Sequence, residues 1–318
     1  MTRTKIRVPS PSARPFVLSA VDRRPAGPAT TGTGRPLVGI ALMIGCMSYF
    51  PLMDAVSKLL QDRLHVSEVV FGRTLIYFAM LLPFLIGKHG FAWLTPAHPW
   101  LQVLRGTLAT GSTVFFTLAI ATLPLADSLA IFFIHPMLAT ALSPLLLGER
   151  VGPWRWSAVF VGFIGALIII RPGFAEISPA MLLAIAAGFC FATSMLLTRR
   201  LAASDPALTT LSISTLISMA VTGGMLPFVW LTPTLSELLL IAVAGFIGFA
   251  GYWMLTLAYS YAAASQLAPF TYVEIVGATV LGYLMFGDFP APIVWAGVSL
   301  IVGSGIVIAW RESRAGRQ

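Results

Sequence analysis

Two ionisable side chains, His135 and Glu274, lie deep inside long apolar stretches of this sequence. Removing either charge from water is expensive, so an ionisable group in such a stretch is a functional candidate by default. A histidine and a desolvated glutamate can both exchange protons near neutral pH. The two residues are therefore predicted to couple protons or to bind a substrate. The alternative is a structural hydrogen bond between helices.

The same two residues fall on equivalent positions of an internal repeat. When the sequence is shifted by 139 residues, 116–172 aligns with 255–311 without a gap, and His135 falls on Glu274. The matched pairs include Gly148 with Gly287, Pro153 with Pro292, and Trp156 with Trp295. The chain therefore contains a duplicated unit with one deeply placed titratable group in each copy.

The composition indicates a protein that folds in lipid. Of the 318 residues, 57% are hydrophobic and 10% are charged, and the mean hydropathy is +0.87. A soluble core needs far less apolar material than this, whereas each helix that crosses a bilayer needs about 20 apolar residues. The basic residues behind the net charge of +8 lie in tails and short loops. This distribution indicates membrane topology rather than a nucleic-acid partner.

Ten apolar spans follow the N-terminal tail, and many of the loops between them carry proline or glycine at their edges. The predicted spans are 37–58, 68–87, 103–122, 126–147, 155–171, 180–199, 209–231, 238–258, 266–286 and 292–310. Prolines inside several spans remove a backbone hydrogen bond and bend the helix, which is tolerated where neighbouring helices cover the break. The predicted fold is an all-α integral membrane protein with ten transmembrane helices.

The distribution of Lys and Arg predicts the orientation of the chain. With ten spans both termini lie on one side, which carries 15 of the 20 basic residues, against three on the other side. Both termini are therefore expected in the cytoplasm, in a multi-pass protein of the cell inner membrane. Residues 1–35, with seven basic residues and one acid, are predicted to form a disordered basic cytoplasmic tail, and residues 312–318 a second tail.

The odd number of spans in each copy predicts that the two copies are inverted. Residues 36–173 form the first five-helix repeat and residues 174–311 the second, so the second enters the membrane from the opposite face. Inverted repeats recur in secondary transporters, where the two halves exchange conformations around a site near the bilayer midplane. The repeat therefore predicts alternating access.

An ordered set of motifs accompanies the repeat. Pro124-Leu-Ala-Asp-Ser-Leu-Ala130 leads into Pro136 and is followed by Leu147-Gly-Glu-Arg150, Trp156, Gly162 and Arg171-Pro172-Gly173. Together with the five-plus-five arrangement of spans, this order resembles the drug/metabolite transporter superfamily, specifically a chain with two EamA domains. The second copy departs from the pattern, because Phe286-Gly-Asp-Phe289 stands where the first has Leu-Gly-Glu-Arg.

The resemblance covers nearly everything after the tail, and it implies a transporter for small organic solutes with a pocket between its halves. Members of the superfamily export amino acids, drugs and metallophores or take up vitamins and nucleoside derivatives, so neither substrate nor direction follows. The candidate solutes are riboflavin or a similar vitamin, an amino acid, a metallophore or a drug.

Charged residues of the first two spans are further candidates. Asp54 and Arg73 are both expected in the external half of the membrane, where an interhelical pair or gate is possible. A guanidinium also suits a substrate carboxylate, because it can bind both oxygens. The alternative is that these charges pair with neighbours and anchor helix ends. Arg105 is expected to snorkel towards the cytoplasmic surface.

Aromatic residues of the later spans complete the predicted pocket. Tyr272 and Trp253 are expected to line it together with Glu274, since their rings can stack on a flat or cationic solute. Tyr252 is the neighbour of Trp253, so the two cannot both face one pocket. The alternative for each ring is helix packing.

The sequence lacks the motifs of a metalloprotein, a hydrolase or an ATP-driven pump. Cys46 and Cys190 lie in apolar runs without a cluster of metal-ligating residues, so neither a disulfide, a metal site nor a cofactor is expected. No nucleophile elbow or P-loop is present. The prediction is a secondary active transporter rather than an enzyme, with a small organic solute, the lipid bilayer and, as a hypothesis, protons as its partners. The alternatives are a membrane-embedded enzyme and a channel.

Overall fold

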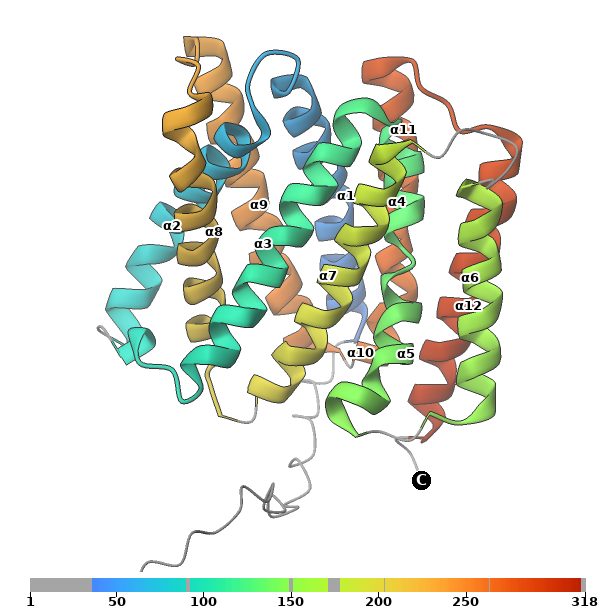
Figure 1. The fold of residues 1–318 in the computed structure, drawn as a ribbon. Coiled ribbons are helices and arrows are strands. Elements are labelled where there is room, and N and C mark those ends of the chain that lie inside the picture. Colours follow the sequence, from blue (N-terminus) through green and yellow to red (C-terminus); the bar gives the residue numbers. More distant parts are fainter. Residues whose placement is uncertain are drawn as a thin grey trace, which may run out of the picture.

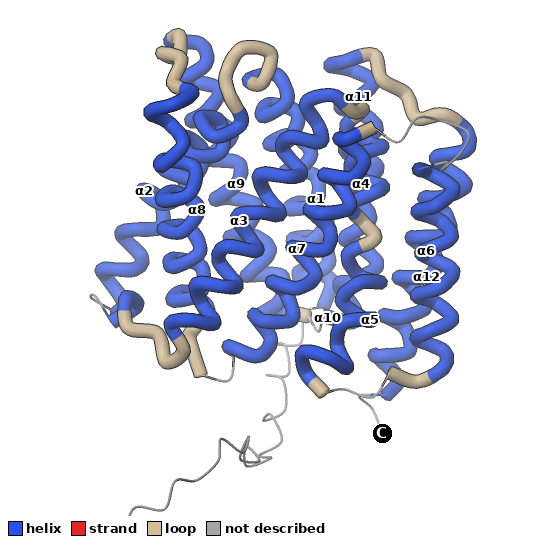
Figure 2. Tube along the Cα trace, viewed as in Figure 1, coloured by secondary structure: helices blue, strands red, loops and turns tan. Residues whose placement is uncertain are grey.

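The computed structural model describes a helical membrane bundle (Figures 1 and 2). The described residues are 36–89, 92–148, 151–170, 178–202, 204–262 and 264–315. The predicted N-terminal tail lies outside them, as do residues 171–177, where the predicted boundary between the repeats falls, and residues 316–318 of the predicted C-terminal tail. All regular elements in the described part of the chain are helices.

Ten membrane spans are built from these helices. The first five spans are α1 (Pro36–Leu60), α2 (Val66–His89), α3 (Pro99–Thr122), α4 (Leu125–Phe132) with α5 (His135–Leu147), and α6 (Pro153–Ile170), with the short η1 (Ala92–Leu94) before α3. The other five are α7 (Pro179–Leu201), α8 (Ala207–Val229), α9 (Leu235–Tyr261), α10 (Ala264–Leu267) with η2 (Ala268–Tyr272) and α11 (Val273–Phe286), and α12 (Pro292–Ala315).

The length and composition of these helices agree with the ten predicted spans. Within the described residues, nine stretches are long and apolar enough to cross a membrane, and Pro292–Val307 of α12 is a shorter apolar helix. The chain is therefore an all-α, multi-pass membrane protein, and the predicted fold class is confirmed.

The fourth span of each repeat is interrupted at the same place. α4 and α5 are separated at Phe133 and Ile134, and in the second repeat the 3₁₀ helix η2 ends at Tyr272, just before α11. Single helices were expected over both spans. Prolines explain the difference: Pro136 lies in the first turn of α5 and Pro269 in the first turn of η2, where neither can donate a backbone hydrogen bond.

The ends of these broken spans match as well. Gly148 after α5 has φ 68° and Gly287 after α11 has φ 71°. Both residues are therefore in the left-handed region that glycine adopts without strain, and each ends its helix in the same way. Residues that the 139-residue shift pairs therefore have the same backbone conformation in the two repeats.

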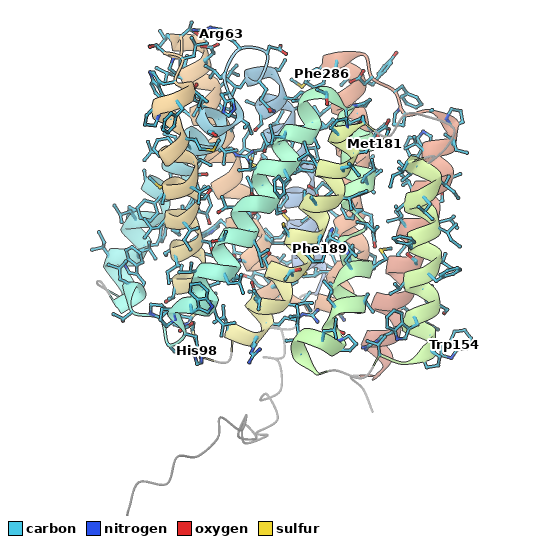
Figure 3. All side chains as sticks on the ribbon, in the orientation of Figure 1. Arg63, His98, Trp154, Met181, Phe189 and Phe286 are labelled. Atoms are coloured by element: carbon cyan, nitrogen blue, oxygen red, sulfur yellow. The ribbon has the colours of Figure 1, made fainter. Side chains whose placement is uncertain are left out.

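Contacts at the helix ends show that the repeats are inverted. Lys58 at the end of α1 donates to the Leu123 carbonyl at the end of α3 (2.8 Å). Gly39 near the start of α1 instead packs against Ala262, directly after α9. α3 and its counterpart α9 therefore run in opposite directions. Figure 3 shows Arg63 and Phe286 at one end of the bundle, called here the Lys58 end, and His98 and Trp154 at the other, called the Trp154 end.

The two repeats are interlocked rather than side by side. α1 packs most extensively on α9, and α3 packs on α7, which is the equivalent pair with the repeats exchanged. The two final helices, α6 and α12, form a separate pair at one edge of the bundle (Figure 1). There the backbones of Gly165 and Gly297 approach so closely that a Cβ on either residue would lie 2.6–2.7 Å from the carbonyl oxygen of the other.

We predict that Gly297→Ala destabilises the protein, because the added methyl group would push α12 away from α6. Overpacking of this kind typically costs about 1–3 kcal/mol. Gly303→Ala on the same helix is the matched control, since a Cβ there meets nothing within 4 Å and alanine favours the helix. Thermal unfolding in detergent should show a lower midpoint for the first variant alone. Equal midpoints would contradict the close packing.

Candidate substrate-binding site

A cavity of about 190 Å³ lies between helices of both repeats. Its walls come from α2 and α3 of the first repeat and from α8 and α9 of the second, with Met53 of α1. Two arginines, Arg73 and Arg105, and two tyrosines, Tyr77 and Tyr252, line it. The hydroxyl-bearing lining residues are Thr74, Thr110, Thr113, Ser214, Thr215 and Ser218. The lining therefore combines charged and hydroxyl groups with apolar side-chain surface.

Equivalent positions of the two repeats build opposite walls of this cavity. Arg73 is the eighth residue of α2, and Ser214 is the eighth residue of α8. The next lining positions correspond in the same way, Thr74 with Thr215 and Tyr77 with Ser218. In the 139-residue register, Arg105 corresponds to Ala244, Ala109 to Gly248 and Thr113 to Tyr252, and all six line the cavity. The cavity thus lies at the interface of the inverted repeats, where transporters of this architecture bind their solutes.

The geometry is symmetric but the chemistry is not. The first repeat supplies Arg73, Tyr77 and Arg105. The second supplies Ser214, Ser218 and Ala244 at the corresponding positions. Both charged residues of the lining therefore come from the first repeat, and the second repeat contributes uncharged residues, among them Tyr252.

Arg73 is held deep in the bundle, with 8% of its surface exposed. Its Nη1 donates to Ser57 Oγ of α1 (3.0 Å) and its Nη2 to Thr117 Oγ1 of α3 (3.4 Å). The predicted partner Asp54 is also buried and is close enough to interact electrostatically with Arg73. No ion pair within 4 Å joins the two among the described residues. The structure brings Asp54 and Arg73 together as neighbours rather than as a salt bridge.

Arg105 turns into the bundle instead of reaching the surface. Its Nε donates to Thr198 Oγ1 of α7 (2.9 Å), and its Nη1 donates to the Thr210 carbonyl (3.3 Å) and to Ser214 Oγ of α8. The expectation of a snorkelling side chain was wrong, because α7 and α8 present acceptors that a sequence of separate spans does not reveal. A charged side chain within a membrane span is unfavourable unless it has partners or a function, so Arg73 and Arg105 are candidate binding groups.

Two tyrosine rings form the aromatic part of the lining. Tyr77 and Tyr252 meet edge to face at 5.9 Å, and Phe50 packs on Tyr252 at 5.2 Å. Trp253, which the sequence favoured, is absent from the lining. Its ring packs on Phe84 at 4.8 Å and is 41% exposed. The structure thus places Tyr252, rather than its neighbour, at the cavity.

A sequence signal for Tyr252 did exist. Ala244, Gly248 and Tyr252 are spaced four residues apart, which puts them on one face of α9. Small residues on that face leave room in front of the tyrosine ring. The face could therefore have been found by following the small residues instead of the largest ring.

His135 and Tyr272 lie in a different place, at the interruption of the fourth spans. The His135 ring is 3.2 Å from the Phe132 carbonyl through Nδ1, and its centroid is 4.8 Å from the ring of Phe191 on α7. Tyr272 packs on Phe133 at 5.2 Å, and the His135 ring lies 5.4 Å from the same Phe133. The structure brings the two residues into one aromatic cluster outside the lining of the cavity.

Glu274 lies on the α1 side of the bundle, in the first turn of α11. One turn further on, Gly277 packs against Pro51 of α1. Glu274 interacts electrostatically with Asp54 and with Tyr252. No hydrogen bond among the described residues involves its carboxylate. Two carboxyl groups therefore lie near Tyr252, although neither belongs to the lining.

We predict that a thiol at position 252 is accessible to water and that a thiol at position 253 is not. The chain has two cysteines, so Cys46→Ala with Cys190→Ala gives a thiol-free background. A water-soluble thiosulfonate reacts with hydrated thiolates and should modify Tyr252→Cys about tenfold faster than Trp253→Cys. Equal rates in the two variants would contradict the position of the cavity.

Comparison with known proteins agrees with this architecture. The sequence matches the EamA-like transporter family over residues 37–171 and again over 178–310. A riboflavin transporter of Rhizobium johnstonii is 30% identical over 287 residues, which cover 89% of this chain and 95% of the relative. An S-adenosylmethionine uptake transporter of Rickettsia bellii is 29% identical over 262 residues, 82% of this chain and 90% of the relative.

A third relative and a solved structure extend the comparison. A pseudopaline exporter of Pseudomonas aeruginosa is 27% identical over 280 residues, 85% of this chain and 95% of the relative. A solved crystal structure with 19% identity shares the fold, with a TM-score of 0.61 over 88% of this chain and 98% of the other. The family matches coincide with the two inverted sets of five spans, and this chain belongs to the EamA-like transporter family of small-molecule transporters.

Proposed function

We propose that the protein is a secondary active transporter that carries a small organic solute across the inner membrane by alternating access. The observation that carries the proposal is the cavity built from equivalent positions of the two inverted repeats. Such a site can open first to one side and then to the other as the repeats exchange conformations. The named relatives include uptake transporters and an exporter, so the proposal covers both directions.

The lining suits a polar solute with a flat part. The two tyrosine rings offer faces for stacking, and the arginines and hydroxyl groups offer hydrogen bonds. Riboflavin or another vitamin, an amino acid, a metallophore and a drug stay candidates, and one of the named relatives is a riboflavin transporter.

Ion pairs at the Lys58 end join the two repeats and provide a candidate gate. Lys58 pairs with Asp288 at 3.5 Å, and Arg63 pairs with Glu237. In both pairs the base comes from the first repeat and the acid from the second. The Arg63–Glu237 pair lies at the surface, where an ion pair contributes about 0–1 kcal/mol, whereas the Lys58 side chain is 13% exposed. Opening of this end would break both pairs.

We further propose that the Lys58 end is external and that both termini are cytoplasmic. The proposal rests on the excess of Lys and Arg on the side of the termini. Asp62 is exposed at the Lys58 end, and Gly152 is exposed before α6 at the opposite end.

In the thiol-free background, we expect a membrane-impermeant maleimide added to intact cells to label Asp62→Cys and to leave Gly152→Cys unlabelled, because the reagent reaches external thiols alone. Permeabilised cells are the control, in which both variants should react. Labelling of Gly152→Cys in intact cells, with protection of Asp62→Cys, would reverse the proposed orientation.

Proton coupling is the remaining part of the proposal, and it assigns Glu274 as the main proton-binding group. Glu274 lies at the interrupted span and near Asp54 and Tyr252. Because Glu274 lies outside the lining, a proton on its carboxyl group would change the charge next to the cavity and leave the cavity free for the solute. His135, at the equivalent position of the first repeat, is proposed as a second proton-binding group.

We predict that Glu274→Gln removes the response of transport to a pH gradient, because the amide cannot take up a proton. Proteoliposomes would be assayed for uptake and counterflow of riboflavin, S-adenosylmethionine and amino acids with and without an imposed gradient. Asp62→Asn, an exposed position outside both ion pairs, is the control and should keep the response. Full gradient-driven uptake by Glu274→Gln would exclude the proposed role, and absence of counterflow for every solute would count against the carrier itself.

A further inference from the structure

The two arginines of the cavity have no acidic counterpart in its lining. Of the residues that form the walls, Arg73 and Arg105 carry charge, and none is an aspartate or glutamate. Tyr252 lies within electrostatic reach of both guanidinium groups. The two guanidinium groups lie at different levels of the cavity, because Thr117, which binds Arg73, is twelve residues, about 18 Å, along α3 from Arg105.

The hydrogen-bond partners of both arginines are neutral. Arg73 donates to the hydroxyl groups of Ser57 and Thr117. Arg105 donates to two hydroxyl groups and one backbone carbonyl. Neutral acceptors satisfy donors but leave the positive charge in place. Burial of a charge without a counter-charge is unfavourable, so an anion in the cavity would be strongly favoured.

Donor groups on both side chains are left for such an anion. Among the described residues, no hydrogen bond uses Nε of Arg73 or Nη2 of Arg105. The existing bonds fix the two planes, so the unused N–H groups are already oriented. A guanidinium can bind both oxygens of a carboxylate at once, and a pre-oriented pair loses little entropy when it does so.

The acidic residues outside the lining lie near Arg73 and not near Arg105. Asp54 interacts electrostatically with Arg73, and Glu274 interacts with Asp54 and Tyr252. Both acids thus lie towards α1 and α11, whereas Arg105 is bound to α7 and α8. The positive charge of the cavity that lacks an acidic neighbour is therefore that of Arg105.

We propose that the transported solute carries a carboxylate, which binds Arg105 while its flat part packs on Tyr77 and Tyr252. This inference rests on the proposed transport function and narrows its substrate class. An uncharged vitamin would leave the Arg105 guanidinium without a counter-charge. An organic acid or an amino acid supplies one.

The test uses the purified full chain in detergent and a pair of probes with nearly the same shape. Indole-3-acetate carries the carboxylate, and indole-3-acetamide replaces it with a neutral amide. A ligand that binds the folded state raises the thermal midpoint by mass action. We expect the carboxylate to raise the midpoint and the amide to leave it unchanged. Equal shifts, or no shift with either probe at millimolar concentration, would overturn the proposal.

Variants at the cavity locate the effect. Arg105→Gln should weaken binding of indole-3-acetate by about tenfold or more, as expected for loss of a hydrogen bond to a charged group. Arg200→Gln, which removes an exposed arginine at the end of α7 and outside the cavity, should bind as the wild type does. Arg105→Lys keeps the charge without the planar fork, so stronger binding by this variant than by Arg105→Gln would show that the loss is not a failure to fold. Undiminished binding by Arg105→Gln would overturn the site.

Two further experiments distinguish a carboxylate from a phosphate ligand and anion binding from transport. Phenyl phosphate tests the anion class, and a larger shift with it than with the carboxylate would overturn the carboxylate in favour of a phosphate. Flux is then measured in proteoliposomes. Carboxylate binding without flux of any solute would contradict the proposed transport function and support the anion site. Saturable flux of neutral solutes without carboxylate binding would contradict the anion site and support the transport function.

Discussion

The need to satisfy every backbone polar group inside lipid governs this structure. A bilayer offers no water to an open N–H or C=O group, so exposed spans have to be helical, and irregular backbone is tolerated only where protein covers it. The two interruptions, at Phe133–Ile134 and at η2, obey this rule. The first is covered by aromatic rings and the second by α1 and α12. Interlocked repeats thus permit breaks that a single helix in lipid could not sustain.

The same constraint explains what the sequence reveals. Length and apolar composition define each span, so the ten spans, the duplicated unit and the family could be predicted before any coordinates. Which face of a span points inward could not, because helices that are apolar on all sides carry little periodic signal. Trp253 was therefore preferred to Tyr252, and Arg105 was placed at the surface, although its acceptors Thr198 and Ser214 lie on helices far away in the sequence.

The most conspicuous charges of the sequence and the cavity occupy neighbouring but separate regions. Glu274 and His135 stand out because they interrupt apolar runs, whereas most of the lining consists of unremarkable hydroxyl groups and small residues. Tyr252 links the two regions, since it lines the cavity and interacts electrostatically with both arginines and with Asp54 and Glu274. A solute site and an ion site that share one side chain can influence each other without overlapping.

The interlocking of the repeats also determines the order in which the protein can be assembled. α1 leaves the ribosome first, yet its main partner, α9, is synthesised almost 200 residues later. Until α9 has been synthesised, Lys58, Asp54 and Arg73 lack the helices of the second repeat that surround them in the finished fold. The most extensive helix contacts of each half are with the other half, and closure of so long a loop precedes the contacts that stabilise it. A chain truncated before α9 would therefore lack the main partner of α1, and we expect membrane quality control to act on such chains during biogenesis.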